Sequence, residues 1–520
     1  MDVTPLSRVA VVGAGPGGLF LATLLRRQLP GVAVTVFERN LRSDAFGFGV
    51  VFSDTTLRAI DDVDPVLRDA LRDHGRHWDR IDVWSSGERH SFGGNGMAAV
   101  HRKVLLHLLQ ENAERAGVEL RFGSPAPPLA ELEAEFDLVV GADGTNSTIR
   151  RQLEARGDLG HEVDTASAKF IWFGTEHLFE GLTFLHRVSD DGNFAVHGYP
   201  ISRDLSTFIV ETDAETWRRA GMDRFDVAQP PGPSDEATQA YLEKLFADDI
   251  GAAALVANNS RWGSFRTRRT ARWFGDRTVL LGDAVHTAHF SVGSGTKMAM
   301  EDAVELAREL TGVVSGERDL EQGLEHYQQT RARSVAKIQA AARPSLSWWE
   351  HFGFYQQHLD PLTFSFHFFA RSIGIEKIAQ RDPALVAAVR GAWLDTHGAP
   401  ALRSALEVAG RDRTVRLGRD LELLAETGPD EVVLRDPAGI TISAPVVVAP
   451  PDEAGLGAAE RRLPAGGPVV IRGEQPLTRA LLAEQARLSH GLVAVVSGPD
   501  LDDDVAETLI LTGRADAVAR

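Results

Sequence analysis

A glycine-rich turn near the start of the chain constrains its fold more than any other feature: GAGPGG, residues 13–18. The apolar run before it, RVAVV (8–12), has the composition of a buried parallel strand. An apolar helical stretch (19–29) follows the turn, and a second strand-like run (32–37) ends at Glu38. This is the order of a Rossmann dinucleotide-binding unit: strand, tight turn, helix, strand and acidic residue. The sequence therefore predicts an α/β domain with a parallel sheet that binds a dinucleotide.

Each glycine of the turn has a mechanical role in that prediction. Gly13 makes the tight turn, Gly15 lets the backbone approach a pyrophosphate, and Gly18 lets the helix pack against the strand. The first N–H groups of the helix and the positive end of its dipole are expected to face the phosphates. Glu38 is expected to accept hydrogen bonds from a ribose. The motif by itself does not distinguish NAD from FAD.

Two later strand-like segments also end in turns that combine glycine with an acid. One leads into GADGTNS (141–147) and the other into GDAVH (282–286). The acid of each turn, Asp143 or Asp283, can hold a ribose or ribityl hydroxyl, and small neighbours let a cofactor lie against the backbone. Taken singly, each segment is equally well explained as an ordinary β-turn.

Together, in this order and spacing, the three motifs resemble the fingerprints of the FAD-dependent aromatic hydroxylases, over roughly residues 7–390. The resemblance implies a Rossmann-like enzyme that binds FAD and oxidises NADH or NADPH. Because the chain has no cysteine and no evident signal for attachment to a histidine, we expect the FAD to be bound without a covalent bond. In that family the reduced flavin reacts with dioxygen to give a C4a-hydroperoxide, which hydroxylates an activated ring. The residues expected to contact FAD are Gly13, Gly15, Pro16, Gly17, Gly18, Glu38, Arg39, Val50, Arg102, Asp143, Asp283, Gly293, Gly295 and Thr296.

The segment HFSVGSGTK (289–297) narrows the family. The common pattern has a proline where this chain has Phe290, and the HFS version resembles the branch that acts on aryl-CoA thioesters. The resemblance implies hydroxylation of an aromatic acyl-CoA, first salicyloyl-CoA and second another 2-substituted benzoyl-CoA. A related indole hydroxylase has a similar segment, so an indolic or free aromatic metabolite is the alternative. The glycines are expected to begin a helix whose N–H groups face the flavin, although they also suit a simple helix cap.

Between about residues 164 and 213 the pattern changes to alternating strands with a DDG turn at 190–192. It predicts an antiparallel sheet that forms one wall of a substrate pocket over the flavin. Alternation sends neighbouring side chains to opposite faces, so only some of its aromatic residues can line that pocket. The candidate substrate residues are Phe48, Trp172, Phe184, His186, Phe290, Arg266, Arg268 and Arg269. The candidate catalytic residues are His286, His197 and Tyr199; for His286 a hydrogen bond that fixes its loop is favoured over a role in proton transfer.

The candidate arginines lie in a local basic cluster, RWGSFRTRRTAR (261–272). A solvated face that balances nearby acids is the more common explanation of such a cluster. The alternative is a grip on the phosphates of a CoA arm, for which guanidinium groups are well suited.

The charge of the whole chain limits the partners it can have. There are 55 Lys and Arg against 73 Asp and Glu, which gives a net charge of −18 and disfavours nucleic acids and anionic membranes. The absence of cysteine excludes disulfides, thiolate metal sites and Cys nucleophiles. No metal site is indicated, and no apolar run reaches the ~20 residues of a membrane span. We expect a cytoplasmic enzyme whose partners are the aromatic acyl-CoA and dioxygen; the sequence specifies no oligomeric state.

The expected organisation has four parts. Residues 1–160 and 260–345 form a discontinuous FAD-binding domain, and residues 161–259 form the inserted substrate domain. Residues 346–397 form a helical, aromatic-rich segment, and residues 398–520 form a small C-terminal α/β domain. No second GxGxxG follows a strand, so we expect no separate Rossmann domain for the nicotinamide nucleotide.

The C-terminal domain resembles pieces of a barrel like that of old yellow enzyme. ITISAPVVVAPPDEAG (440–455) resembles the opening of such a barrel, and DVAETLILTGRADAVAR (504–520) resembles its close. Only about 80 residues span these points, whereas a (β/α)₈ barrel takes about 250. The sequence predicts a truncated remnant that neither closes a barrel nor holds a second flavin. A thioredoxin-like cap is the alternative.

Overall fold

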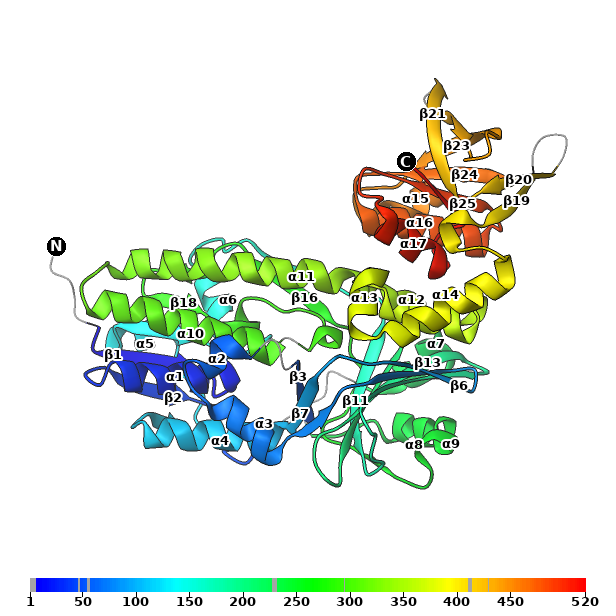
Figure 1. Ribbon diagram of the computed structural model, residues 1–520. Coiled ribbons are helices and arrows are strands. Elements are labelled where there is room, and N and C mark those ends of the chain that lie inside the picture. The colour runs from blue at the N-terminus through cyan, green and yellow to red at the C-terminus, as the bar shows by residue number, and fades with distance from the viewer. Residues whose placement is uncertain are drawn as a thin grey trace. The chain divides into compact units, whose positions relative to one another are not determined.

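The computed structural model describes residues 6–44, 47–53, 57–226, 232–293, 295–409, 414–428 and 430–520. The chain forms two compact units (Figure 1), which we call the N-terminal and the C-terminal unit. The N-terminal unit comprises Met1–Ile81 and Asn95–Glu350, and the C-terminal unit comprises Asp82–Gly94 and His351–Arg520. None of the helices within the described ranges is long and apolar enough to cross a membrane. The division into four parts stays a prediction.

A six-stranded sheet with the order β17–β18–β9–β1–β2–β8 lies at the centre of the N-terminal unit. The pairs from β18 to β8 are parallel, and β17 runs antiparallel to β18. The inner strands are short apolar runs that are almost wholly buried, as strands covered on both faces must be. The predicted strand–turn–helix–strand order is confirmed. The bounds are β1 (Arg8–Val12), β2 (Ala33–Phe37), β8 (Glu119–Arg121), β9 (Leu138–Gly141), β17 (Phe274–Gly275) and β18 (Thr278–Leu280).

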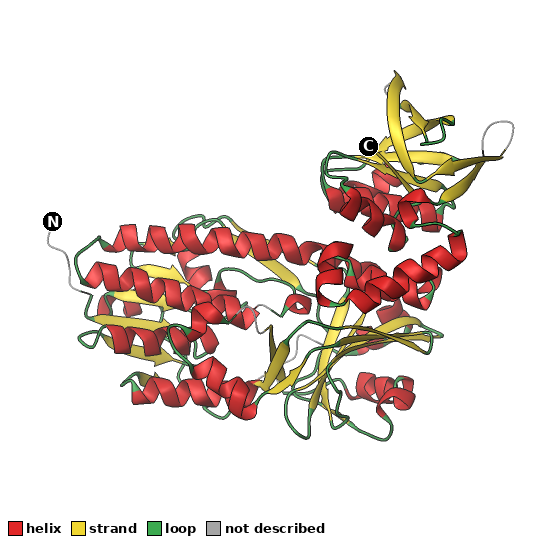
Figure 2. Cartoon of the chain, viewed as in Figure 1, coloured by secondary structure: helices red, strands yellow, loops and turns green. Residues whose placement is uncertain are grey.

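Helices cover this sheet (Figure 2), and their apolar residues form one core with its strands. Leu19 of α1, Leu105 of α4 and Leu306 of α10 are fully buried in this core. The helices of this part are α1 (Pro16–Gln28), α2 (Arg58–Asp61), α3 (Val66–His74), α4 (Arg102–Arg115), α5 (Leu129–Glu135), α6 (Thr148–Glu154), α10 (Gly295–Val314) and α11 (Leu320–His358).

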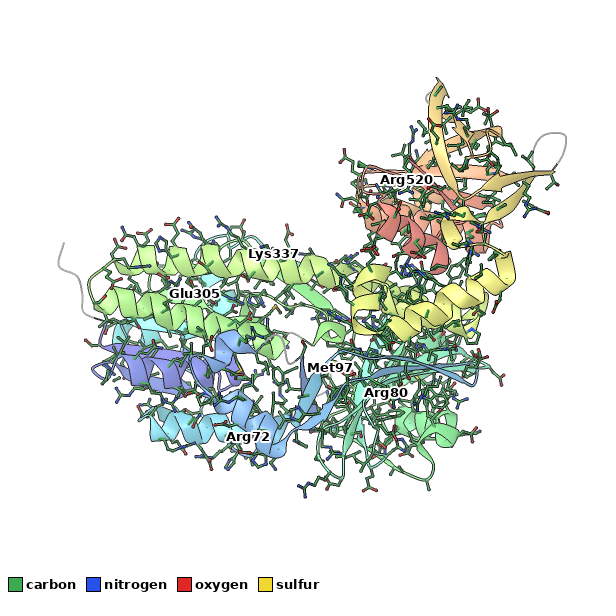
Figure 3. The ribbon with its side chains drawn as sticks, viewed as in Figure 1. Arg72, Arg80, Met97, Glu305, Lys337 and Arg520 are labelled. Carbon is green, nitrogen blue, oxygen red and sulfur yellow. The ribbon has the colours of Figure 1, made fainter. Side chains whose placement is uncertain are left out.

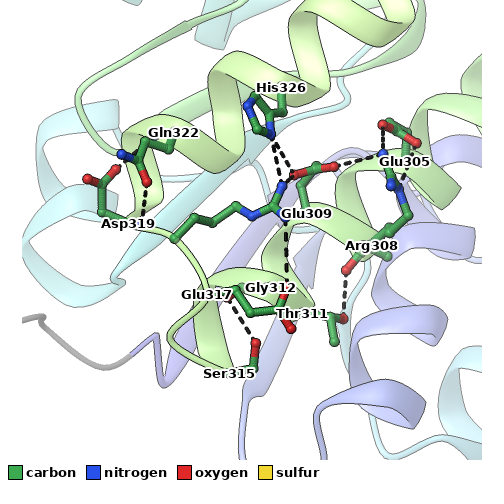
Figure 4. A network of polar contacts seen from close by, with 12 residues as sticks. Glu305, Arg308, Glu309, Thr311, Gly312, Ser315, Glu317, Asp319, Gln322 and His326 are labelled. Atoms are coloured by element: carbon green, nitrogen blue, oxygen red, sulfur yellow. Dashed lines mark hydrogen bonds and ion pairs between the residues drawn. The ribbon is translucent and has the colours of Figure 1, made fainter.

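A buried carboxylate, Glu309, fixes the connection between α10 and α11 (Figure 4). Its side chain is only 2% exposed; Oε1 lies 2.8 Å from Nη2 of Arg308, and Oε2 forms an ion pair with Arg318. Asp319 accepts a 2.8 Å hydrogen bond from the N–H of Gln322 in the first turn of α11. Arg308 belongs to α10 and Arg318 to the connection, so the two cations offset the buried charge and hold the connection against the end of α10. The opposite end of α10 reaches the candidate site described below.

The predicted antiparallel sheet is confirmed, in the strand order β15–β11–β14–β13–β12. Phe173, Phe194 and Phe208 project from one face and pack with Leu242 and Phe246 of the helices beneath. The strands and helices are β11 (Lys169–Thr175), β12 (Leu182–Ser189), β13 (Gly192–Pro200), β14 (Ser206–Thr212), β15 (Leu255–Val256), α7 (Ala214–Arg219), α8 (Glu236–Leu245) and α9 (Ala247–Ile250). Two smaller sheets complete the unit: β10 (His161–Thr165) with β16 (Arg266–Thr270), and β3 (Gly49–Ser53), β7 (Met97–His101) and β4 (Arg76–Trp78).

The C-terminal unit combines helices with a small barrel. Tyr355 of α11 and His367 of α12 both contact Glu484 of α16. The helices are α12 (Pro361–Phe369), α13 (Ile375–Arg381), α14 (Pro383–His397), α15 (Leu456–Glu460), α16 (Pro476–Glu484) and α17 (Asp503–Leu511). The strands are β5 (Ile81–Ser85), β6 (Glu88–Phe92), β19 (Ala405–Ala409), β20 (Thr414–Gly418), β21 (Asp420–Gly428), β22 (Glu431–Arg435), β23 (Thr441–Val448), β24 (Pro468–Arg472), β25 (Val493–Ser497) and β26 (Ala517–Ala519).

The expectation that this tail cannot close a barrel is wrong, because β21 to β26 form a closed barrel. Val470, Val495 and Ala517 belong to one buried cluster, and the alternate residues Val469 and Val496 pack in another with the helices. About 80 residues are too few for an eight-stranded (β/α)₈ barrel but not for a smaller one. Closure depends on strand number and stagger together, and β21 and β22, which precede the counted stretch, complete a barrel of six. The likeness to old yellow enzyme stays a prediction.

Candidate flavin and substrate site

A first cavity of about 460 Å³ lies where the carboxyl ends of β1, β2 and β9 meet. We call it the nucleotide cavity. This edge of a parallel sheet is where α/β proteins bind their ligands. The cavity is lined by Val12, Gly13, Gly15, Phe37, Glu38, Arg39, Asn40, Pro125, Ala126, Pro127, Pro128, Ala142, Asp143, Gly144, Thr148 and Gln152.

The glycines of the first turn leave this cavity open. Gly13 has a φ of +111°, and a Cβ there would lie 2.3 Å from the carbonyl oxygen of Ala142. A Cβ on Gly18 would lie 2.2 Å from the carbonyl oxygen of Gly13, so helix and strand meet there at backbone distance. A Cβ on Gly15 would meet nothing within 4 Å, because that side of Gly15 faces open space. A side chain at position 15 would therefore fill the cradle that a pyrophosphate needs.

Two acids stand at the wall of the nucleotide cavity. Glu38 accepts hydrogen bonds from the backbone N–H groups of Ala14 and Asn40, both at 2.9 Å. Asp143 accepts from the N–H of Thr148 at 2.6 Å through Oδ2. Its Oδ1 is buried and has no hydrogen-bond partner among the described residues. A buried acceptor of this kind needs a donor, and a cofactor hydroxyl would supply one. The open cradle and this acceptor fit FAD.

A second cavity of about 620 Å³ continues from the same turn, and we call it the ring cavity. Gly15, Ala142 and Gly144 line both cavities. Its volume lies within the roughly 300–1,000 Å³ that small-molecule sites occupy. Every residue expected to contact FAD lines one of the two cavities. That these residues touch FAD stays a prediction.

The cofactor end of the ring cavity is formed by the starts of two helices and by the GD turn. Arg102 begins α4, and Gly295 and Thr296 begin α10. Asp283 lies in the short turn η3 (Gly282–Ala284) and is exposed to solvent in this cavity. Arg102 and Asp283 attract each other electrostatically across this end.

A buried carboxylate under the GD turn holds this turn in place. Asp302 of α10 accepts hydrogen bonds from the N–H of Gly282 at 3.1 Å and from Nε of Arg331 at 2.7 Å, and it lies 2.7 Å from Nε2 of His286. Burial alone would raise the pKa of Asp302, but His286 and Arg331 hold it below its usual value. His286 does not line either cavity. Its position favours the loop-fixing role over the catalytic one.

The far end of the ring cavity is aromatic. Met97, Trp172, Phe184, His197, Tyr199 and Phe290 line it. Met97 lies at the start of β7 (Figure 3). The His197 ring lies 4.9 Å from that of Phe184 and 5.6 Å from that of Phe290. Trp172, Phe184, His197 and Tyr199 project from the sheet face opposite to the one that packs on α8. Alternation thus divides the side chains of the sheet: Phe208 points into the core and His197 into the cavity.

Three other candidates do not line the ring cavity. Phe48 is buried against Gly174, where a Cβ would lie 2.7 Å from its ring. His186 stacks on Trp349 at 6.0 Å, and burial lowers the pKa of His186 to about 3. Arg269 is absent from the lining, whereas its neighbours Arg266 and Arg268 are part of it. Because β16 is extended, residues 266 and 268 share one face and residue 269 faces the other way.

A carboxylate that sequence analysis missed stands beside His197. Oε1 of Glu211 on β14 lies 2.7 Å from Nε2 of His197 on β13, and the two side chains are 2% and 4% exposed. Burial raises the pKa of Glu211 to about 7. The one signal in the sequence is an acid inside the otherwise uncharged strand STFIVET. Among the described residues, no group of three or more His, Asp or Glu is arranged to hold a metal ion.

Comparisons with known proteins agree with this geometry. The family described as FAD binding domain matches residues 7–131 and 129–342. A protein from Streptomyces sp named salicyloyl-CoA 5-hydroxylase is 52% identical over 98% of this chain and 99% of its own length. A 3-hydroxy-4-methyl-anthranilyl-[aryl-carrier protein] 5-monooxygenase from Streptosporangium sibiricum is 34% identical over 66% of this chain and 88% of its own.

Solved structures share the fold of the N-terminal part. PqsL from P. aeruginosa, crystallised with 2-aminobenzoylacetate, matches with a TM-score of 0.51 at 25% identity and covers 66% of this chain and 96% of that one. A 2-methyl-3-hydroxypyridine-5-carboxylic acid oxygenase matches with a TM-score of 0.51 at 19% identity, over 68% of this chain and 97% of its own. The fold, the cavities and the family match lead to one conclusion: the chain belongs to the FAD-dependent monooxygenases of the FAD binding domain family.

Proposed function

We propose that this chain hydroxylates the aromatic ring of an acyl-CoA thioester, with salicyloyl-CoA as its substrate, and consumes NAD(P)H and dioxygen. The observation that carries the proposal is the 52% identity to a salicyloyl-CoA 5-hydroxylase over 98% of the chain. A second relative is named for an anthranilyl group on an aryl-carrier protein, so its substrate is also an aromatic acyl group on a carrier. The absence of cysteine suits the cytoplasm, which is the compartment we propose.

The chain's own residues divide the work of holding FAD. Gly13, Gly15 and Gly18 with the start of α1 would receive the pyrophosphate, and Glu38 and Asp143 would receive hydroxyl groups. In the ring cavity, the N–H groups at the start of α10 would stabilise negative charge on the reduced ring. When bound, FAD supplies the two-electron chemistry that inserts one oxygen atom of dioxygen into the substrate ring.

The aromatic end of the ring cavity suits the substrate ring. Trp172, Phe184 and Phe290 offer apolar faces and exclude water, while His197 and Tyr199 offer polar atoms to a ring hydroxyl. Both polar residues are buried, so they are fixed before the substrate arrives. Because His197 faces the cavity, we assign to it the contact with the ring hydroxyl.

Arg266 and Arg268 at the edge of the ring cavity are our candidates for the phosphates of the CoA arm. They lie on the same face of β16, and Nη1 of Arg268 lies 3.2 Å from Nε2 of His161. Nε of Arg268 is buried and has no hydrogen-bond partner among the described residues, so this guanidinium has a donor to offer an anion. Binding energy from the phosphates would position the ring, as remote binding energy does in other enzymes.

The test is a substrate panel with the full-length holoenzyme. Salicyloyl-CoA, 2-aminobenzoyl-CoA, benzoyl-CoA, salicylate and indole are incubated with NADH or NADPH in air, and each product is analysed by mass. We expect one added oxygen atom on salicyloyl-CoA and fast nicotinamide oxidation with it. Benzoyl-CoA lacks an activating group and is the matched control, so it should stimulate oxidation without product. Equal turnover of salicylate and salicyloyl-CoA would contradict the thioester assignment.

A further inference from the structure

A buried histidine–carboxylate pair lies in the wall of the ring cavity, and Glu211 has no role in the function proposed above. His197 pairs with Ile209 across the strands, and Ala195 pairs with Glu211. Residues that pair directly project from the same face, so His197 and Glu211 stand side by side on the cavity face of the sheet. His197 lines the cavity, and Glu211 lies behind it at 2.7 Å.

The groups around Glu211 only partly offset the cost of burying a carboxylate. Burial raises the pKa of Glu211 to about 7. His289, the residue before the short helix η4 (Phe290–Val292), opposes this shift, and Glu350 of α11 adds to it. His186 on β12 faces His197 from the other side. Asp302, by contrast, is held by the guanidinium of Arg331, by His286 and by a backbone N–H. A carboxylate kept near neutral pKa beside a cavity is typical of proton transfer rather than of structural support.

We propose that His197 and Glu211 act together as the proton acceptor for the ring hydroxyl of the substrate. This inference rests on the proposed function, because it needs a phenolic ring in the cavity. The phenol O–H bond breaks and its proton passes to one ring nitrogen of His197. The proton on Nε2 of His197 passes to Oε1 of Glu211. His197 ends neutral, Glu211 ends as a carboxylic acid, and the phenolate oxygen carries the negative charge that Glu211 gave up.

This transfer leaves the charge of a buried cavity unchanged. One negative charge is present before the transfer and one after it, so no new ion has to be desolvated. A phenol has an ordinary pKa of about 10, and a phenolate pushes electron density into the ring that is to be oxygenated. An acceptor with a pKa of about 7 makes ionisation far less unfavourable than transfer to water would be. His197 is the catalytic residue, and Glu211 acts through it.

The experiment follows the ionisation of bound substrate directly. Holoenzyme with Glu211→Gln is titrated with salicyloyl-CoA without oxygen from about pH 6 to about pH 9, and the absorption band of the phenolate is recorded. We expect the apparent pKa of the bound phenol to be higher than in the wild type by about one unit or more. The single-turnover rate of hydroxylation at neutral pH should fall about a hundredfold. The FAD content and the affinity for the thioester should stay within about twofold, because Glu211 touches neither in this proposal.

Two controls separate proton transfer from support of the fold. Thr212→Val removes a buried hydroxyl from the same strand, where it donates to the carbonyl oxygen of Asn193 at 2.8 Å. It should leave the phenol titration unchanged. A 3-fluoro salicyloyl-CoA has a more acidic phenol and should restore much of the rate to Glu211→Gln. Glu211→Asp keeps a carboxylate and should show a phenol pKa between those of the wild type and Glu211→Gln.

Each outcome decides between the hypotheses. An unchanged phenol pKa and rate in Glu211→Gln, with an active wild type, would overturn the proton-acceptor role. If Glu211→Gln fails to fold, the same titration is carried out on Glu211→Asp. A bound phenol with the wild-type pKa in Glu211→Asp, together with a hydroxylation rate that does not change with the 3-fluoro substrate, would then overturn the proton-acceptor role. A wild type that binds salicyloyl-CoA but never hydroxylates it would overturn the proposed function and this inference with it.

Discussion

Two buried carboxylates of the N-terminal unit show how neighbours decide what an acid does. Asp302 contacts His286, Arg331 and the N–H of Gly282, and these contacts hold its pKa below the usual value. Glu211 contacts His197, and burial raises its pKa to about 7. The first is fixed as an anion and supports a loop. The second is close to taking up a proton at neutral pH, which is the property that a proton acceptor needs.

Asp302→Asn should destabilise the protein and weaken FAD binding. The change removes the 2.7 Å ion pair between Asp302 and the buried guanidinium of Arg331, which keeps Glu301 at 3.0 Å, and this loss costs about 2 kcal/mol. It also frees the GD turn, because the N–H of Gly282 loses a charged acceptor. Thermal unfolding and the FAD content of the purified protein check this. Glu325→Gln on the exposed side of α11 is the control, and equal melting temperatures of the two variants would contradict the role of Asp302.

At the scale of elements, β16 presents different side chains to its two faces. Arg266 and Arg268 line the ring cavity, whereas Arg269 faces Glu162 of β10 in the opposite direction. Arg266→Gln should raise the KM for the acyl-CoA about tenfold with a smaller effect on kcat, because a charge-assisted contact used equally in ground and transition states is lost. The effect should shrink at high salt, which screens an exposed charge.

Steady-state kinetics at low and high salt measure this effect. Arg272→Gln is the matched control, because Arg272 is exposed just beyond β16 and lines neither cavity. The same KM in Arg266→Gln and Arg272→Gln would remove β16 from the phosphate site and leave the flavin assignment intact.

In the C-terminal unit, a buried cluster joins α11, α12 and α16. Glu484 accepts from the hydroxyl of Tyr355 at 2.6 Å and from Nε of Arg514 at 3.0 Å, and it lies 3.1 Å from Nε2 of His367. Burial, with Arg514 beside it, lowers the pKa of His367 to about 4, although Glu484 opposes the shift. His367 is therefore neutral in the folded protein at neutral pH.

The sign of this shift predicts loss of stability in acid. The unfolded chain takes up a proton on His367 below its ordinary pKa of about 6.5, and the folded chain does so only near pH 4. The stabilising contribution is complete above pH 6.5 and is lost as the pH falls towards 4. Between pH 7 and pH 5 the loss is about 2 kcal/mol. Scanning calorimetry should show a smaller fall in melting temperature for His367→Gln than for the wild type. His358→Gln, an exposed histidine of the same unit, should behave like the wild type.

At the scale of the whole molecule, the two units have different interiors. The N-terminal unit contains the two cavities, whereas the barrel of the C-terminal unit is filled by apolar side chains such as Val470, Val495 and Ala517. A filled barrel has no room for a flavin on its axis. We therefore expect one FAD per chain and a hydroxylated product whose ring is still aromatic. Flavin absorbance against protein concentration and the mass of the product check this, and two flavins per chain or a ring-reduced product would contradict it.

The sequence alone determined the parts of the site that depend on local backbone geometry. The first turn can be recognised in the local sequence, because only glycine fits at two of its positions. Gly13 adopts a φ of +111°, and Gly18 meets the backbone of Gly13. Asp143 and Asp283 follow strands directly, so their position at the sheet edge also follows from the chain order. The alternation of β11 to β14 predicted the sheet, though not which of its faces lines the cavity.

Tertiary structure alone decided the contacts between residues far apart in the chain. The pairing of β13 with β14 brings Glu211 to His197, and the packing of α10 against the GD turn brings Asp302 to His286. A single acid in an otherwise uncharged strand has the same local pattern whether it is paired or not, since its partner is set by register and packing. The closure of the barrel is of the same kind: strand lengths are local, but the pairing of β21 with β26 joins the two ends of the domain.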